Sequence, residues 1–167
     1  GYEATSLVDL TEATGLNKAS LYRVFGDKHQ LFKTTLKHYA EMEFREVTSV
    51  IREDASPLEN IRAIVRKITT DFAHEKGCMI TNSMVELAPH DAEIGQMLQE
   101  FGEKRVQALT GVITMAQQAG EIRPELVPLE LAASLMITLA GSAAMVKGFM
   151  KEPQIIKNLE NLIDSWT

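Results

Sequence analysis

Helix start and stop signals recur along the chain, and they restrict its fold more than any other feature of the sequence. Ser6 and Asp9 have the spacing of a capping box, and Gly15 can end that helix in the left-handed conformation. Asn17 can cap a second short helix that reaches about Phe25. Strand-like alternation of apolar and polar residues does not stand out. The sequence therefore predicts an all-α fold.

The helices that follow are predicted to be longer. One of about 25 residues begins near Asp27. Ser56-Pro57-Leu58-Glu59 combines a serine cap with proline in the first turn, which favours a helix start, and Gly77 can end that helix. Further helices are predicted over about 80–88, from Asp91 to Gly120, from Pro128 to about Met150, and from Pro153 onward.

Two short helices joined by a tight, glycine-containing turn are typical of a helix-turn-helix. Its second helix enters the major groove of DNA, so the first turn of that helix needs short or flexible polar side chains. The residues of that turn are Lys18, Ala19 and Ser20. Tyr22 and Arg23, one turn later, can reach phosphates. Lys28 places a charge beside the free amides at the start of the next helix, and the two together attract phosphate.

The joint spacing of Gly1-Tyr2, Gly15, Leu21-Tyr22, Phe25 and Lys28 resembles the DNA-binding domain of the TetR family of bacterial regulators. The resemblance implies an all-helical homodimer that acts as a repressor and that a small ligand releases from operator DNA. It also implies Thr5 as a DNA contact. In the family a helix precedes the Gly-Tyr loop, so we expect that this first helix is missing from the sequence.

Three positions depart from the family pattern. Thr11 and Thr14 stand where the family usually has alanine, so we expect each hydroxyl to bond to a backbone group. Val24 replaces the usual His or Tyr and removes one expected phosphate contact. These departures affect the assignment of single contacts rather than the family.

The distribution of charge supports a division into two parts. The net charge of −6 argues against a protein that coats nucleic acid without regard to sequence. Residues 1–39 nevertheless hold five Lys and Arg against four acidic residues, whereas the remainder holds twelve against nineteen. A locally basic end on an acidic body fits specific DNA binding. We expect a helix-turn-helix DNA-binding domain with its connecting helix over residues 1–45, and a regulatory and dimerisation domain over residues 46–167.

We expect a cytoplasmic protein without a membrane partner. The uncharged stretch Leu131–Val146 is short for a membrane span and carries hydroxyl side chains, so it is predicted to be a buried helix. No signal peptide is visible. Cys78 is the single cysteine and cannot form an internal disulfide, which fits a reducing compartment.

Eight methionines suggest a ligand pocket in the second part. Methionine adapts its shape, so a cluster can line a pocket for varied apolar ligands, although plain core packing is an equal alternative. The candidates for ligand contact lie on the predicted inward faces of three successive helices. They are Phe72, Met97, Phe101, Met115, Met136 and Leu139.

The segment Gly77–Ala88 is similar to a sub-branch of the same family. In some members of that branch a cysteine after glycine senses oxidants or electrophiles, which implies Cys78 as a candidate redox sensor. The alternative is a small buried hydrophobe. The sensor needs exposure and a lowered thiol pKa, for which Lys76 and the next helix N-terminus are candidate causes. His74 lies four residues before Cys78, but no third ligand is near, so we predict no metal and no cofactor.

The last two predicted helices suggest a homodimer. Small residues recur every seven positions at Ser134, Gly141 and Gly148, which would let another helix approach closely. A stripe on the last helix would complete a four-helix interface between two chains, as in the family, or else an intrachain core. The stripe consists of Ile155, Leu159, Leu162 and Trp166.

Two alternatives to a ligand-released repressor remain at this point. One is a repressor that senses oxidants or electrophiles through Cys78, and the other is a helical adaptor without DNA binding. An enzyme is disfavoured, because the sequence has no Gly-rich phosphate loop and no nucleophile elbow.

Overall fold

The computed structural model describes residues 1–74 and 77–167. Those residues form α-helices and no strands, so the predicted all-α fold is confirmed. The helices are α1 (Leu7–Thr14), α2 (Lys18–Phe25), α3 (Lys28–Thr48), α4 (Pro57–His74), α5 (Met79–Glu86), α6 (Ala92–Gln118), α7 (Pro128–Met145) and α8 (Glu152–Asp164).

Local hydrogen bonds set the starts of the first helices as the sequence predicted. The Ser6 hydroxyl accepts the Asp9 amide at 3.2 Å, and the Asp9 carboxylate accepts the Ser6 amide at 2.7 Å. Gly15 ends α1 with a φ of 68°, a conformation that costs glycine little. The Asn17 side chain accepts the amide of Ser20 at 2.9 Å and starts α2.

Two helices are shorter than predicted. α3 has 21 residues and ends at Thr48. α7 ends at Met145 rather than near Met150, and the amides of Lys147 and Gly148 instead bond to carbonyls three residues back. Because glycine disfavours a helix interior by about 1 kcal/mol, Gly148 favours this tighter turn.

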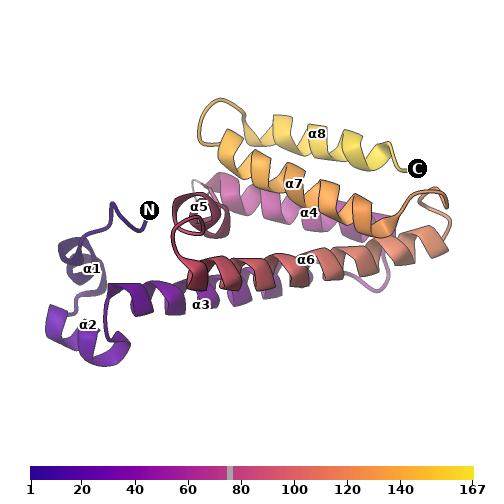
Figure 1. Cartoon of the computed structure of the whole chain (residues 1–167). Helices are drawn as coiled ribbons and strands as arrows, with labels where there is room; N and C mark the ends of the chain where they lie inside the picture. The colour runs from indigo at the N-terminus through magenta and orange to yellow at the C-terminus, as the bar shows by residue number, and fades with distance from the viewer. Residues whose placement is uncertain (75–76) are drawn as a thin grey trace.

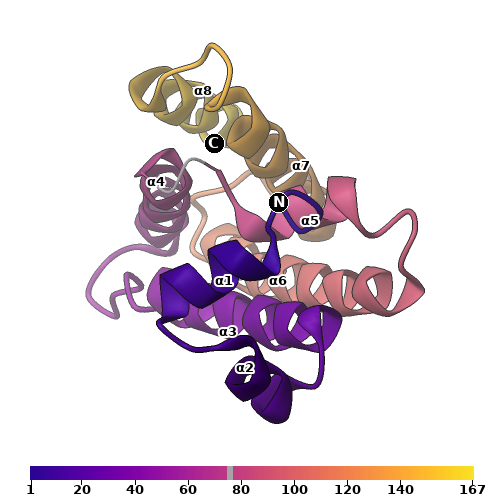
Figure 2. The ribbon, with the colours of Figure 1, turned by 90° about the vertical axis from the view of Figure 1, so that its left-hand side faces the viewer.

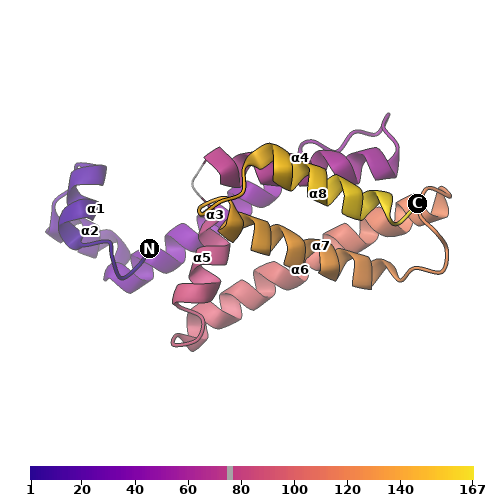
Figure 3. The same ribbon diagram turned by 90° about the horizontal axis from the view of Figure 1, so that it is seen from above.

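α1 and α2 lie at one end of α3, beyond the bundle that the later helices form (Figures 1 and 3). Seen along the bundle, α3 and α6 lie on one side and α7 and α8 on the other (Figure 2). A large core joins α4, α6, α7 and α8, and a small core joins α3, α5 and α6. α3 runs through the predicted domain boundary at 45/46, so that division stays a prediction.

α8 packs inside the chain. Three residues of the predicted dimer stripe, Ile155, Leu159 and Trp166, are at most 3% exposed in the large core. Arg62 on α4 donates to Asp164 at 2.6 Å, and Arg66 donates to Glu160 at 2.8 Å. These two exposed ion pairs bind α8 to α4 outside the core. For these three stripe residues the intrachain alternative holds, because α4 covers the apolar face of α8.

α7 buries only one side. It is long and apolar enough to cross a membrane by length and composition, with mean hydropathy 1.4, but 22% of its residues are buried in the chain. Ile137 is 74% exposed, and the neighbouring Ser134, Gly141 and Gly148 are exposed as well. The prediction of a buried helix is therefore wrong for this face, because no described helix of the same chain covers it.

Candidate functional sites

The outer face of α2 carries the predicted base-reading residues. Leu21 is 1% exposed and fixes α2 against its neighbours, while Lys18, Ala19 and Arg23 are exposed. The Lys18 ammonium lies 5.6 Å from the centre of the Tyr22 ring, so these two side chains share one side of α2. This face is free to enter a groove of DNA.

The remaining predicted DNA contacts lie around this face and are partly buried. The Thr5 hydroxyl donates to the carbonyl of Gly1 at 2.7 Å, and the Ser20 amide is bonded to the cap of α2. The ammonium of Lys28 lies 4.3 Å from the centre of the Tyr2 ring. Burial, followed by nearby carboxylates, raises the pKa of Tyr2. Lys28 therefore lies over an aromatic ring at the start of α3.

The three departures from the family pattern have simple structural outcomes. The hydroxyl of Thr11 donates to the Val8 carbonyl at 2.9 Å, and that of Thr14 donates to the Leu10 carbonyl at 2.7 Å. Both bonds are of the predicted kind, within the same helix. Val24 is 66% exposed and occupies the outer surface of α2.

Polar contacts that the sequence did not reveal attach the segment before α1 and the start of α3 to α5 and α6. The Glu86 carboxylate accepts the backbone amides of Tyr2 at 3.0 Å and Glu3 at 2.9 Å, and these bonds lower its pKa. His29 Nε2 lies 2.6 Å from an Asp91 carboxylate oxygen, and Lys33 pairs with Glu93. Each pair joins residues 60 to 84 positions apart, and no local pattern identifies such partners.

Asp91 combines two roles. Its other carboxylate oxygen accepts the amides of Ile94 at 3.0 Å and Glu93 at 3.1 Å, which caps α6 as the sequence predicted. The bond from the Ile94 amide and the bond with His29 lower the pKa of Asp91. The same side chain therefore starts α6 and holds α3 beside it.

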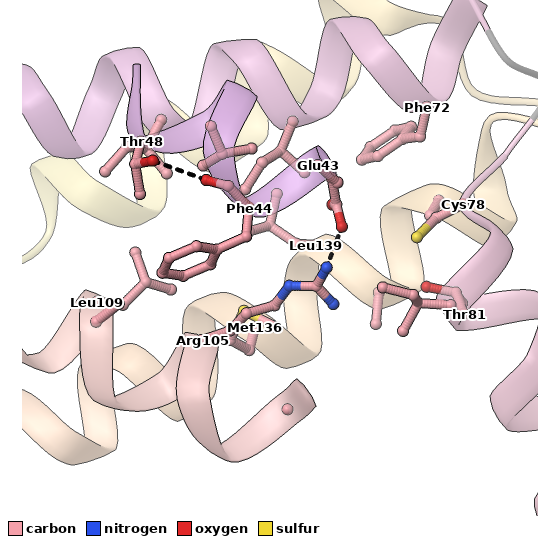
Figure 4. A pocket seen from close by; sticks show the side chains of 18 of the residues that line it. Glu43, Phe44, Thr48, Phe72, Cys78, Thr81, Arg105, Leu109, Met136 and Leu139 are labelled. Carbon is pink, nitrogen blue, oxygen red and sulfur yellow. Dashed lines mark hydrogen bonds and ion pairs between the residues drawn. The ribbon is translucent and has the colours of Figure 1, made fainter. Parts of the chain in front are cut away.

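A cavity of about 900 Å³, including the part open to solvent, lies among α3, α4, α5, α6 and α7. Figure 4 shows its wall: Phe44 from α3, Phe72 from α4, Leu109 from α6, and Met136 and Leu139 from α7. A concave, mainly apolar site of this kind is suited to a small organic molecule.

One ion pair lies inside the apolar wall. Arg105 of α6 donates through Nη2 to the carboxylate of Glu43 on α3, and both side chains are about 15% exposed (Figure 4). Close by, Lys67 of α4 lies 3.2 Å from the carboxylate of Glu46. The C-terminal half of α3 is therefore fixed to the cavity by charge as well as by apolar packing.

The structure brings together half of the predicted ligand contacts. Phe72, Met136 and Leu139 line the cavity. Met97 and Phe101 do not, because they lie one to two turns before Arg105 on α6 and line a separate groove against α3. Met115 is 56% exposed, because the inward face of α6 at that level is occupied by Ile113 and Ala116. The sequence predicted the helices, but it did not show at which level along α6 the cavity lies.

Cys78 lines the same cavity. It is half-buried at the start of α5 and lies beside Thr81 (Figure 4). Lys76, the predicted source of a lowered thiol pKa, lies outside the described residues. Within residues 1–74 and 77–167, no three His, Cys, Asp or Glu side chains gather as metal ligands would.

Comparisons with known proteins match both parts of the chain. A family model for bacterial regulatory proteins of the tetR family matches residues 1–35, and a model for the tetracyclin repressor-like C-terminal domain matches residues 57–163. The HTH-type transcriptional regulator YezE of Bacillus subtilis is 32% identical over 128 residues, which cover 75% of this chain and 66% of that protein. The HTH-type transcriptional repressor ComR of Escherichia coli is 33% identical over 133 residues, which cover 74% and 61%.

The chain therefore spans three fifths to two thirds of the length of these relatives. Among solved structures, regulatory protein TetR from Rhodobacter sphaeroides superposes with a TM-score of 0.90 at 19% identity, over 100% of this chain and 90% of that chain. A cysteine mutant of the regulator CifR, complexed with 26-bp operator DNA, superposes with a TM-score of 0.86 at 22% identity, over 100% and 88%. These likenesses in structure show the fold.

Proposed function

Because this chain belongs to the TetR family of bacterial transcriptional regulators, we propose that it acts as a repressor that binds operator DNA through α2. The observation that carries the proposal is the exposed first turn of α2, with Lys18 and Ala19 outermost and Arg23 one turn on. Operator DNA lies in the bacterial cytoplasm, so we place the protein there. The family consists of DNA-binding regulators rather than enzymes.

A gel-shift experiment tests this function against the alternative of a helical adaptor. Genomic fragments of the source organism are mixed with the full-length protein and an excess of non-specific duplex. A repressor retains a small number of fragments in the presence of the competitor. If no fragment is retained above the non-specific background at any salt concentration, the protein is not a specific DNA binder.

A ligand in the cavity would act on DNA binding through α3. This helix carries Lys28 beside the DNA-binding face and Glu43 in the wall of the cavity. A ligand that favours a displaced α3 therefore favours a displaced α2. A hundredfold loss of operator affinity needs about 2.7 kcal/mol of coupling, which is within the usual range for two linked sites.

The partner on the exposed face of α7 is, we propose, α7 of a second copy. The face holds Ser134 and Gly141 at a spacing of seven, with the exposed Ile137 between them, and the exposed Gly148 follows just beyond the end of α7. Open space surrounds Gly141, since nothing lies within 4 Å of an added Cβ atom. Small residues allow close helix approach, and the apolar side chain would be removed from water. The outward face of α8 is polar and would form the rim.

Cys78 supports a second trigger for release. Because its side chain lines the cavity, alkylation or oxidation there would add a bulky or polar group at the place where a ligand binds. Cys78→Ser separates the two triggers. In a gel shift the variant should lose release by peroxide or electrophiles and keep release by apolar compounds. A variant that responds to both as the native protein does excludes Cys78 as a sensor.

A further inference from the structure

The ion pair in the cavity gives the site a chemical preference. Of the described residues that line the cavity, only Glu43 and Arg105 are charged. Partial burial withdraws both groups from water, so the bonds that they make within the protein must offset the lost hydration. A change of partner at either group therefore has a larger effect on the interaction energy in this apolar surrounding than it would have in water.

Arg105 keeps binding capacity that Glu43 does not use. The bond from Arg105 to Glu43 uses Nη2, and a guanidinium has five N–H donors in a planar fork that fits a carboxylate with two parallel bonds. Among the described residues, no fully buried side-chain nitrogen lacks a partner. Any nitrogen of Arg105 without a partner is therefore at least partly exposed, and its side chain lines the cavity (Figure 4).

We propose that the cavity takes an organic anion, in which a carboxylate on a mainly hydrocarbon body binds Arg105 in place of Glu43. The body would lie against Phe44, Leu109 and Met136, which line the same cavity (Figure 4). This inference names the ligand class of the proposed repressor and rests on that function for its biological meaning.

The exchange of partners explains how such a ligand would move α3. Glu43 and the ligand carboxylate carry the same charge, and they repel each other in the low dielectric of the cavity. The repulsion falls when α3 moves away from α6. The ligand therefore binds more tightly to the conformation with α3 displaced, which is the requirement for shifting an equilibrium between two conformations. A neutral ligand of the same shape lacks this repulsion, so it favours the displaced conformation less.

Isothermal titration calorimetry with three molecules of equal length tests the ligand class on the free full-length protein. The probes are octanoate, 1-octanol and octylamine. Octanoate should bind at least about tenfold more tightly than octanol, because charge-assisted hydrogen bonds to Arg105 add to the burial of the same chain. The proposal fails if octanoate does not bind, if octanol binds as tightly, or if octylamine binds more tightly than octanoate.

Variants at the two charged residues should change octanoate affinity in opposite directions. Arg105→Gln should lower it to the level of octanol, and Glu43→Gln should raise it several-fold, because the competing negative charge is gone. Octanol affinity should stay unchanged in both, which shows that the cavity is intact. Arg66→Gln removes an Arg–Glu pair outside the cavity and serves as the matched control. Unchanged octanoate affinity in Arg105→Gln overturns the assignment.

The same proteins separate this inference from the proposed function. Calorimetry needs no DNA, so it decides the ligand class even if no operator is found. On a retained operator fragment, octanoate should release the native protein and not the Arg105→Gln variant. Equal release of both would overturn the link from Arg105 to α3.

Discussion

Among single residues, Lys28 connects the DNA-binding face to the helices around the cavity. It is the first residue of α3, and its ammonium lies against the ring of Tyr2. The backbone amide of Tyr2 is in turn bonded to Glu86 on α5. A phosphate bound at Lys28 would therefore be linked by two direct contacts to a helix that borders the cavity.

Two lysines near α2 are expected to contribute differently to DNA binding. Lys28→Ala should weaken binding to all duplexes by a similar factor and flatten the salt dependence by about one unit, because a phosphate contact carries no sequence information. Lys18→Ala should instead change which bases are preferred. Fluorescence anisotropy with operator and scrambled duplexes over a range of salt measures both.

Lys157→Ala is the matched control for these variants, since Lys157 is exposed on α8 at the far side of the bundle. It should bind DNA as the native protein does. If Lys18→Ala and Lys28→Ala both resemble this control, the assignment of α2 as the recognition helix is wrong.

Single residues also show what the sequence could predict. The hydroxyls of Thr11 and Thr14 bond within their own helix, so local chemistry was sufficient to predict these bonds. Glu43 and Arg105 are 62 positions apart, and neither stands out in the sequence. Their pairing depends on how α3 crosses α6, which only the packed fold determines.

Among the helices, the residue at which a helix starts was easier to predict from the sequence than the helix against which it packs. Caps at Ser6, Asn17 and Asp91 act over two or three residues and are visible in the sequence. The apolar stripe of α8 was also visible, but a stripe does not state whether its partner is α4 or another chain. Leu159 is 0% exposed within the single chain, so the partner of that face is inside the same chain.

The cap of α6 should make stability depend on pH. Asp91→Ala should lower the free energy of unfolding at pH 7 by about 1–2 kcal/mol, because two amides of α6 lose their acceptor. The pKa of Asp91 is lowered in the folded state, so the ionised carboxylate stabilises the fold above its ordinary pKa of 3.8. That stabilisation should fade as the pH drops below 3.8.

Urea unfolding of the native protein and the variant between pH 7 and pH 3 measures this difference. The difference in free energy of unfolding between the native protein and the variant should be constant near neutral pH and should become smaller in acid. A difference that is independent of pH down to pH 3 would mean that the charge of Asp91 does not contribute to stability.

The proposed role of the exposed face of α7 in dimerisation can be tested by placing a large side chain on it. Gly141→Leu leaves the single chain room for the new side chain and favours the helix by several tenths of a kcal/mol. In a dimer the leucine would prevent close approach of the partner helix. Sedimentation velocity should therefore show a folded monomer where the native protein is a dimer.

Gly111→Leu on α6 is the control, because Gly111 is also an exposed helical glycine with open space around it. This variant should stay dimeric. A dimer that persists in Gly141→Leu, or a monomeric native protein, contradicts pairing through α7. A native protein that requires detergent to stay in solution would point to lipid as the occupant of this face.

At the scale of the whole molecule, α3 is the part that belongs to both functions. Its first half packs in the small core with α5 and α6, and its second half lines the cavity. The ionic contacts of Lys33 and Glu43 bind it to α6 at two levels. A ligand that breaks the second contact leaves the first as a pivot, so a displacement of α3 at the cavity also tilts the end of α3 that carries α2.

Two copies of α2 should read DNA as a pair, which hydroxyl-radical footprinting on a retained genomic fragment can show. We expect two protected patches on one face of the duplex, related by a dyad and about 34 Å apart, since paired recognition helices enter successive major grooves. Substitution of Lys18 should weaken both patches together. A single patch, patches without dyad symmetry, or uniform protection along the fragment would contradict the claim.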